Sequence, residues 1–337
     1  MGGKGMKKIW LLLALLTIGG IVGGVAIGAW RLKQEPRVAA DVSLLVAPDQ
    51  RLLVAGWTLS QLTERLNEYG QHLDVAPIEP QIDPITKGVI PGLAGQSLDI
   101  ATTVARVLAA PAGAEVPLAF TPIYPQSLWE YSNYPIYQGN PNKKQMALVI
   151  NVAWGNEHLP GMLETLEREQ VRASFFLVGR WAAKNADLIQ AIAEGGHEFG
   201  NHAYSDPHLP LLDKEAIARE IERTSEVIKE VTGQEVRFFS PPYNDFDQKV
   251  LDVASELGYL TVLCSLDTAD WMRLGVERIV RRIVPRAHNG GIVLMHPTEQ
   301  TPAALIEIIR GLKGQGYSLV TVGELLAPLP GSTEIPR

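Results

Sequence analysis

The sequence predicts an α/β protein whose largest unit, residues 145–328, is built on a parallel sheet. Apolar segments typical of strands alternate there with segments of helical periodicity, which indicates successive strand–helix–strand units. Such units place their strands parallel in one sheet, and closure into a barrel is one of the two usual forms of that sheet. Seven segments are strand-like: Met146–Val152, Ala173–Val178, Glu198–His202, Arg237–Pro241, Leu260–Leu266, Ile292–His296 and Ser318–Val322.

One helix between these strands is especially clear, over residues 213–231. Asp213 is a suitable N-cap because its carboxylate can accept a hydrogen bond from the first turn. Gly233, just past the last apolar position, is typical of a helix C-terminus. The predicted buried face consists of Ile217, Ile221, Thr224 and Ile228.

Composition limits what the remainder of the chain can be. The 337 residues are 46% hydrophobic and 20% charged, so two folded units with linkers are expected and wholesale disorder is excluded. The net charge of −7 argues against a nucleic-acid partner. Cys264 is the sole cysteine, which excludes a disulfide framework and a cysteine-rich zinc site. We expect it to be a buried, unreactive thiol.

The N-terminal region predicts a membrane segment. Residues 9–30 carry no charge and follow a short tail, residues 1–8. As a helix they would be about 33 Å long, enough to cross the hydrocarbon core of a bilayer. We predict an uncleaved, single-pass signal anchor; a signal peptide cleaved after the small residues around Ala26–Ala29 is the alternative.

Residues 38–123 predict a small α+β module. Helical patterns cover Thr58–Tyr69, with Thr58 as a suitable N-cap, and Ser97–Leu108. Extended segments lie near Ala76–Ile82 and over Val116–Ile123. Part of it, "GLAGQSLDIATTVARVLAAPAGAEVPLAFTPIYP", resembles the peptidoglycan-binding modules that precede some bacterial cell-wall enzymes. A spacer that lifts the next domain off the membrane is the alternative. Residues 124–144, rich in Pro, Tyr, Asn and Gln, predict a linker.

Polar side chains stand at the carboxyl ends of five predicted strands. In β/α barrels this edge of the sheet is where loops form the functional site, so we expect one cavity there. The segments concerned are Asn151–Gly155, Asn201–His208, Ser240–Tyr243, Asp267–Trp271 and Leu294–His296.

These segments, with "VRASFFLVGRWAAKNADLIQAIAEGGHEFGNHAYSDPHL" and "GGIVLMHPTEQTPAALIEIIRGLKGQGYSLVTVGELL", resemble the NodB-homology polysaccharide deacetylases, carbohydrate esterase family four. The resemblance implies a distorted seven-stranded (β/α) barrel. Family members remove N- or O-acetyl groups from chitin-like chains, peptidoglycan or xylan with a divalent metal. For this chain it implies peptidoglycan as partner. Together with the anchor predicted over residues 9–30, we expect a cell-membrane location with the C-terminal domain outside the cytoplasm.

The resemblance also implies a mechanism. In the family, an Asp and two His hold zinc or a similar ion, which binds water and the acetyl carbonyl. A second Asp, tethered by an Arg, is the base, and a Tyr backbone N–H completes the oxyanion hole. A His oriented by an Asp protonates the leaving amine, while Trp and Leu surround the acetyl methyl group.

Four positions that carry the family's chemistry are changed in this sequence. The motif Thr-Phe-Asp-Asp-Gly is here Asn151–Gly155, so that Ala153 stands at the base position and Trp154 at a metal-ligand position. Asp206 replaces the second histidine ligand, and Ser240 replaces the arginine. The Asn-Val-Ala-Trp-Gly form resembles a sporulation-associated branch of the family.

Other family positions are retained. By resemblance, Tyr243, Asp270 and His296 are remnants of the catalytic machinery, and Trp271 and Leu294 form the acetyl pocket. Trp154 either fills the former metal position or stacks on a sugar ring, and we include it with the substrate-binding residues.

Metal binding is not the main expectation for this sequence. A zinc-type site would have to be rebuilt from His202, Asp206 and His208, with Glu157 as another candidate ligand. Three functions therefore stay open: a glycan-binding protein with impaired or absent hydrolysis, an active de-N-acetylase with a remodelled metal site, and an envelope scaffold. The sequence does not determine the oligomeric state.

Overall fold

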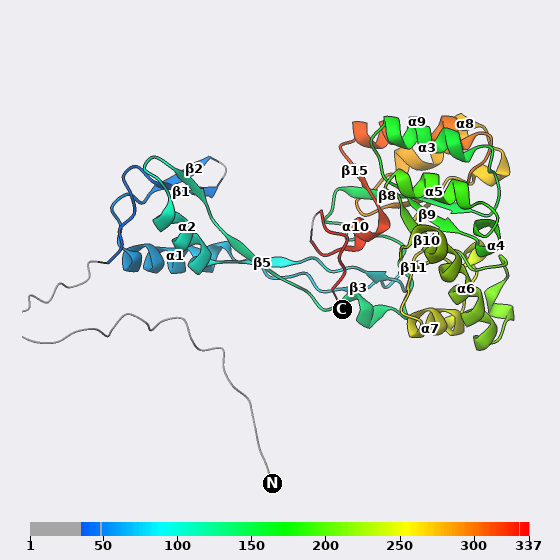
Figure 1. Cartoon of the computed structure of the whole chain (residues 1–337), viewed down its shortest axis with the longest axis horizontal. Coiled ribbons are helices and arrows are strands. Elements are labelled where there is room, and N and C mark those ends of the chain that lie inside the picture. The colour runs from blue at the N-terminus through cyan, green and yellow to red at the C-terminus, as the bar shows by residue number, and fades with distance from the viewer. Residues whose placement is uncertain (1–34, 48, 330, 337) are drawn as a thin grey trace, which may run out of the picture.

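A computed structural model describes residues 35–47, 49–329 and 331–336, which form a small and a large lobe joined by an extended ribbon (Figure 1). The predicted signal anchor, residues 9–30, lies outside the described residues. Within the described ranges, no helix is both long enough and apolar enough to cross a membrane.

The small lobe has a three-stranded sheet and two helices around its own apolar core, which includes Leu44, Leu62 and Val107. Thr58 caps the first helix through reciprocal hydrogen bonds with Gln61, as predicted. The second helix begins at Ile100, later than predicted, because the Asp99 carboxylate accepts from the Thr102 N–H and acts as its N-cap. The elements of the small lobe are β1 (Ser43–Ala47), β2 (Gln50–Leu53), α1 (Leu59–Leu73), α2 (Ile100–Ala109) and β6 (Glu115–Pro117).

The ribbon consists of short antiparallel strand pairs. The predicted strand Ala76–Ile82 is reduced to β3 and isolated bridges, because Pro77 and Pro80 lack the N–H that a ladder needs. The predicted extended segment Val116–Ile123 divides between β6 of the small lobe and β7 of the ribbon. The strands are β3 (Gln81–Ile82), β4 (Val89–Ile90), β5 (Gly95–Leu98) and β7 (Phe120–Ile123).

Residues 124–144, expected to be a linker, pack along the large lobe. They contain the short 3-10 helix η1 (Leu128–Tyr131). Ile136 is fully buried and forms a bridge with Val262. The buried Lys143 ammonium donates to the carbonyls of Glu324 and Leu325, at 3.1 and 2.9 Å, and so caps the C-terminus of a helix.

The large lobe confirms the α/β prediction. Its strands are all parallel and follow the order β12-β11-β10-β9-β8-β14-β13, with β15 also paired to β8, in a sheet that curls into a half-barrel. They are β8 (Gln145–Val152), β9 (Ser174–Leu177), β10 (Glu198–Asn201), β11 (Phe238–Phe239), β12 (Leu260–Thr261), β13 (Leu266–Asp267), β14 (Ile292–Met295) and β15 (Ser318–Val320).

The prediction of seven strands is corrected by one. Within the described residues the sheet has eight, because the predicted strand Leu260–Leu266 breaks in the middle. Its first part pairs with β11 and its last part with β14, at opposite edges of the sheet. Between these two parts, the Leu263 N–H donates to the Ile136 carbonyl at 2.8 Å. Here the chain therefore pairs with the 124–144 segment and not with another strand of the sheet.

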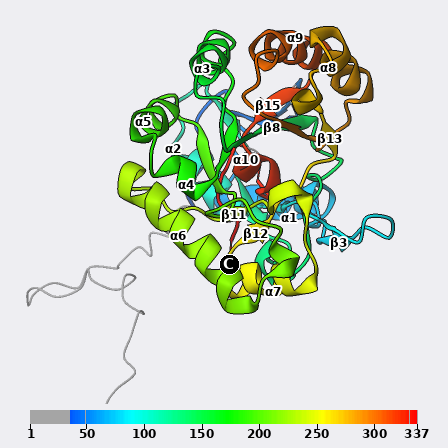
Figure 2. The same ribbon diagram turned by 90° about the vertical axis from the view of Figure 1, so that its right-hand side faces the viewer.

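Helices surround the curled sheet (Figure 2). The helix predicted over residues 213–231 is confirmed: Asp213 accepts from the Ala216 N–H at 2.7 Å, Gly233 adopts φ 70° at the C-terminus, and the predicted face is buried. The helices are α3 (Leu159–Arg168), α4 (Gly179–Ala182), α5 (Ala186–Glu194), η2 (Leu209–Leu211), α6 (Lys214–Thr232), η3 (Pro242–Asn244), α7 (Gln248–Glu256), η4 (Asp270–Met272), α8 (Val276–Ile283), η5 (Val284–Arg286), α9 (Thr301–Gly314) and α10 (Val322–Leu326).

Candidate functional site

A cavity of about 520 Å³ lies at the carboxyl ends of the strands, where the sequence places the polar segments. Each of the five segments contributes to its wall, since parallel strands deliver their carboxyl ends to one edge of the sheet. The lining residues are Asn151, Ala153, Trp154, His202, Asp206, Tyr243, Asn244, Asp267, Trp271, Leu294 and His296.

On one side of the cavity, His296 is held by the fully buried Asp270. The Asp270 carboxylate accepts hydrogen bonds from His296 Nδ1 at 2.9 Å and from the His296 backbone N–H at 2.7 Å. It also accepts from the Trp271 N–H at 3.0 Å and the Thr301 hydroxyl at 2.9 Å. Four donors satisfy this buried charge, and Nδ1 of His296 carries the proton, which leaves Nε2 for the cavity.

Aromatic and aliphatic groups flank this pair. Leu294 is buried at the cavity wall, whereas Trp271 is 58% exposed. Trp154 is 47% exposed and lies nearly parallel to the His296 ring, at an interplanar angle of 7° and a centroid distance of 6.3 Å. Half of the Trp154 side chain is therefore available to a ligand, so that it does not fill a buried position.

On the opposite side, His202 is buried and both of its ring nitrogens are engaged. Nδ1 lies 2.7 Å from the Ser240 carbonyl oxygen, which can only accept, so Nδ1 carries the proton. Nε2 must then accept from Asn151 Nδ2, at 3.3 Å. Burial lowers the pKa of His202 to about 4, and the imidazole is neutral at neutral pH.

This arrangement fixes the orientation of Asn151. Its Nδ2 donates to His202, and its buried Oδ1 has no hydrogen-bond partner among the described residues. The position is the first of the Asn-Val-Ala-Trp-Gly motif, at the end of β8.

The other predicted metal ligands face different partners. Asp206 accepts from the Tyr243 hydroxyl at 3.2 Å and lies 4.0 Å from the Arg180 guanidinium. His208 Nδ1 is 2.8 Å from Asp245, and its ring stacks on Tyr243 at 4.5 Å. Glu157 instead pairs with the neighbouring His158 ring, at 3.4 Å.

The predicted ligand set His202, Asp206 and His208 is therefore not assembled. In the part of the chain that the structure describes, no three His, Cys, Asp or Glu side chains are grouped to hold a metal ion. The physical reason is that each candidate has another partner, and Asn151 takes the nitrogen with which His202 would coordinate. The side chains present do not fit a zinc ion.

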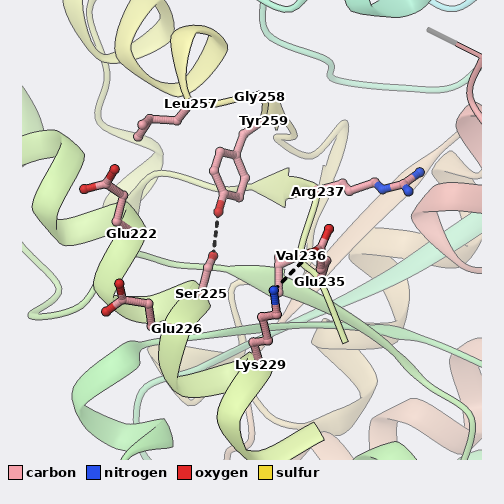
Figure 3. Close-up of a pocket in the computed structure, with 10 residues that line it drawn as sticks. All are labelled: Glu222, Ser225, Glu226, Lys229, Glu235, Val236, Arg237, Leu257, Gly258 and Tyr259. Carbon is pink, nitrogen blue, oxygen red and sulfur yellow. Dashed lines mark hydrogen bonds and ion pairs between the residues drawn. The ribbon is translucent and has the colours of Figure 1, made fainter. Parts of the chain in front are cut away.

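A chain of hydrogen bonds connects Tyr259, Ser225 and Asn201 to the turn that contains His202. Tyr259 donates to Ser225 at 2.7 Å, inside a second hollow of about 570 Å³ beside α6 (Figure 3). Asn201 Nδ2 donates to the same hydroxyl at 2.8 Å, and its Oδ1 accepts from the Ala203 N–H at 2.9 Å. The chain links the surface of α6 to the residues on both sides of His202.

Three lining residues had no role assigned from the sequence: Asn151, Asp267 and Asn244. Asn151 and Asp267 stand at strand ends, which was the available signal, but nothing local shows that they reach the cavity. Cys264 was expected to be buried but is only half-buried. Desolvation still raises its pKa to about 12, which agrees with an unreactive thiol.

Comparisons with known proteins define the family. The model of the polysaccharide deacetylase family matches residues 138–262. The uncharacterized protein YlxY of Bacillus subtilis is 36% identical over 79% of this chain and 83% of its own length. A peptidoglycan-N-acetylglucosamine deacetylase of Bacillus cereus is 34% identical over 58% of this chain and 95% of its own length. The chain belongs to the polysaccharide deacetylase family.

Solved structures of family 4 carbohydrate esterases are also similar to this chain. BA3943 of Bacillus anthracis, a CE4 family pseudoenzyme, shares 36% identity and a TM-score of 0.67, over 80% of this chain and 96% of that one. A BA3943 mutant described as having restored enzymatic activity gives the same TM-score, 0.67, at 35% identity, over 80% of this chain and 99% of that one. PdaA of Bacillus subtilis, a family 4 carbohydrate esterase, shares 28% identity and a TM-score of 0.56, over 59% of this chain and 87% of that one.

Proposed function

We propose that this protein binds a peptidoglycan-type glycan in the cavity and has little or no deacetylase activity. The observation that carries the proposal is the contrast between the two sides. His296, held by the buried Asp270, and Trp271 line one side of the cavity, while Ala153 and Trp154 stand where the resemblance requires two acids. Neither side chain can accept a proton at neutral pH or coordinate a metal.

The relatives support both parts of this proposal. Several are peptidoglycan deacetylases by name, which favours a cell-wall glycan as ligand. BA3943 is called a pseudoenzyme and aligns over most of this chain, which favours absent hydrolysis. We also propose that residues 9–30 anchor the protein in the cell membrane with the large lobe outside the cytoplasm, in the cell or spore envelope.

Acetate release separates the proposal from an active enzyme. The purified full-length protein is incubated with acetylated peptidoglycan, with and without a chelator. We expect release at background level from the unchanged protein. Release that the chelator abolishes would overturn the proposal and establish an active de-N-acetylase with a remodelled metal site.

A fourfold variant is the positive control for that assay. It carries Ala153→Asp, Trp154→Asp, Asp206→His and Ser240→Arg, which rebuild the family set. The mutant of BA3943 described as having restored activity makes such a gain a reasonable expectation. The variant shows that substrate and conditions permit detection.

Binding is tested by titrating soluble peptidoglycan fragments into the full-length protein and following tryptophan fluorescence. The double variant Trp154→Ala, Trp271→Ala should lose binding, because both exposed rings line the cavity. Tyr124→Ala removes a comparably exposed aromatic ring outside the cavity lining and should retain it. Equal binding by the double variant would remove the cavity from the proposal. If His296→Ala and Trp271→Ala also preserved function in cells, an envelope scaffold would be favoured.

A further inference from the structure

One outer segment of the large lobe is strongly basic, although the whole chain has a net charge of −7. Residues 273–286 contain five arginines, no lysine and a single carboxylate, Glu277, so the segment has a net charge of +4. It includes α8 and η5, and α8 lies on the outside of the curled sheet beside α9 (Figure 2). The arginines, which we call the arginine stripe, are Arg273, Arg278, Arg281, Arg282 and Arg286.

The helix α8 presents its arginines on the face opposite its core contacts. Ile279 and Ile283 are fully buried and define the inner face. At about 100° per residue, the three arginines of the helix fall within about 100° of one another on the other face. Arg282 is half-buried, and its Nε donates to the Asp267 backbone carbonyl at 3.0 Å, whereas the other four arginines are exposed.

Most of this charge has no counterion in the protein. Arg281 pairs with Glu277 at 3.1 Å. Arg273, Arg278 and Arg286 form no ion pair within the described ranges. Cations in the last turn of α8 stabilise the helix dipole, but Arg278 lies in the first turn, where a cation is unfavourable. Like charges three and four positions apart also destabilise a helix. The arginine stripe therefore costs stability that a bound anionic partner would offset.

The arginine stripe begins beside the cavity and leads away from it. Because β13 and β14 are parallel, α8 runs from the carboxyl edge of the sheet back to the amino edge. Arg273 follows Trp271 by two residues, and Arg282 contacts the backbone of Asp267; Trp271 and Asp267 both line the cavity. The eight residues of α8 cover about 12 Å, and an extended peptide of about five residues spans about 17 Å. A branch of a ligand in the cavity would therefore reach along the stripe.

We propose that the arginine stripe binds the carboxylates of the short acidic peptides that branch from a peptidoglycan strand, while the sugar chain occupies the cavity. Guanidinium groups pair with carboxylates through two parallel hydrogen bonds, which favours arginine over lysine at such a surface. The peptide branches extend away from the sugar chain and carry several carboxylates, so they match a row of cations that leads away from the cavity. The proposal rests on the proposed function, since it requires a glycan in the cavity.

Calorimetric titration of the full-length protein with two matched probes tests this inference. One is a soluble peptidoglycan fragment with free peptide carboxylates, and the other is the same fragment after those carboxylates are converted to amides. We expect the acidic fragment to bind about tenfold more tightly, as a few exposed ion pairs would produce, and high salt to remove the difference. Equal or tighter binding of the amidated fragment would overturn the inference and leave the proposed function standing. Absence of binding by both fragments would overturn the proposed function together with the inference.

The double variant Arg278→Gln, Arg286→Gln removes two exposed cations of the arginine stripe. Glutamine is also a good helix former, so we expect the fold to persist, which circular dichroism checks. We expect the preference for the acidic fragment to fall about fivefold, with binding of the amidated fragment unchanged. An unchanged preference would contradict the assignment of the carboxylates to this surface.

A control of equal charge is the double variant Arg219→Gln, Arg237→Gln, at exposed positions outside the arginine stripe and the cavity lining. It should leave both affinities unchanged. If it reduced the preference as much as the stripe variant, the preference would be general attraction and the inference would be overturned. Soluble poly(glycerol phosphate) is the third probe. Stripe-dependent binding of this polymer, without a preference for the acidic fragment, would assign the stripe to a phosphate polymer and overturn the inference.

Discussion

Each side of the cavity holds one histidine, and the two have opposite surroundings. His296 is attached to a buried carboxylate that four donors satisfy. His202 is attached to a backbone carbonyl and a side-chain amide, without a direct hydrogen bond to any charged group. The difference shows that the departure from the family pattern has not left an empty metal site. Neutral hydrogen bonds engage both ring nitrogens of His202, while the hydrogen bond between Asp270 and His296 is retained opposite.

The largest effect on the free energy of unfolding should come from removing the buried Asp270 carboxylate. Asp270→Ala would leave four donors without their acceptor in a buried place, at an expected loss of about 3–5 kcal/mol in the free energy of unfolding. Asp206→Ala removes a partly exposed carboxylate of the same cavity, and we expect a change within about 1 kcal/mol. Urea denaturation of both variants measures the difference, and equal losses would contradict this account.

The buried, neutral His202 should make the stability of the protein depend on pH. Burial lowers the pKa of His202 from 6.5 to about 4, so that between these values the unfolded chain binds a proton that the folded protein does not. Stability should therefore fall as the pH is lowered through this window, by about 3 kcal/mol for the single group.

His202→Asn should remove that contribution, which denaturation at several pH values would show. His197 needs its own variant, since burial lowers its pKa to about 4 as well and produces a parallel fall. Identical pH profiles for the unchanged protein and His202→Asn would refute a buried neutral His202.

A smaller effect is expected on zinc affinity when Asn151 is replaced. In the fourfold variant that restores Asp, His and Arg at the family positions, we expect Asn151→Thr to tighten zinc binding by about tenfold. Asn151 Nδ2, at 3.3 Å from His202 Nε2, would otherwise have to move before that nitrogen could coordinate. Competition with a chromophoric chelator gives the affinities. Asn142→Thr, at an exposed position, is the matched control, and an equal gain there would exclude the interpretation.

The smallest effect should come from breaking the hydrogen-bond chain that links Tyr259 to the residues on both sides of His202. Tyr259→Phe removes the hydrogen bond to Ser225 and should destabilise the protein by about 1 kcal/mol. The same variant should shift the NMR signals of the His202 ring, since Asn201 connects the two. Tyr131→Phe, which removes an exposed hydrogen bond to Gln126, should change neither quantity measurably. An unperturbed His202 in Tyr259→Phe would mean that the chain of hydrogen bonds does not position it.

The fold could be predicted where its signals are local. The caps Thr58 and Asp213 act on residues three positions away, and the sequence shows both partners at once. The segment Leu260–Leu266 could not be divided in this way. Its two halves pair with β11 and β14, and the break depends on Ile136, more than a hundred residues earlier in the chain.

The same distinction applies to the site. The sequence by itself determined the α/β class, the edge of the sheet where the cavity lies and the chemical losses at Ala153, Trp154 and Ser240, because residue identity and strand periodicity are properties of the chain. Only the tertiary structure decided that His202 bonds to Asn151, that His208 turns to Asp245 and that Asp267 faces the cavity. A side chain's hydrogen-bond partner depends on which distant segments the fold brings within about 3 Å of it, and no local pattern encodes that.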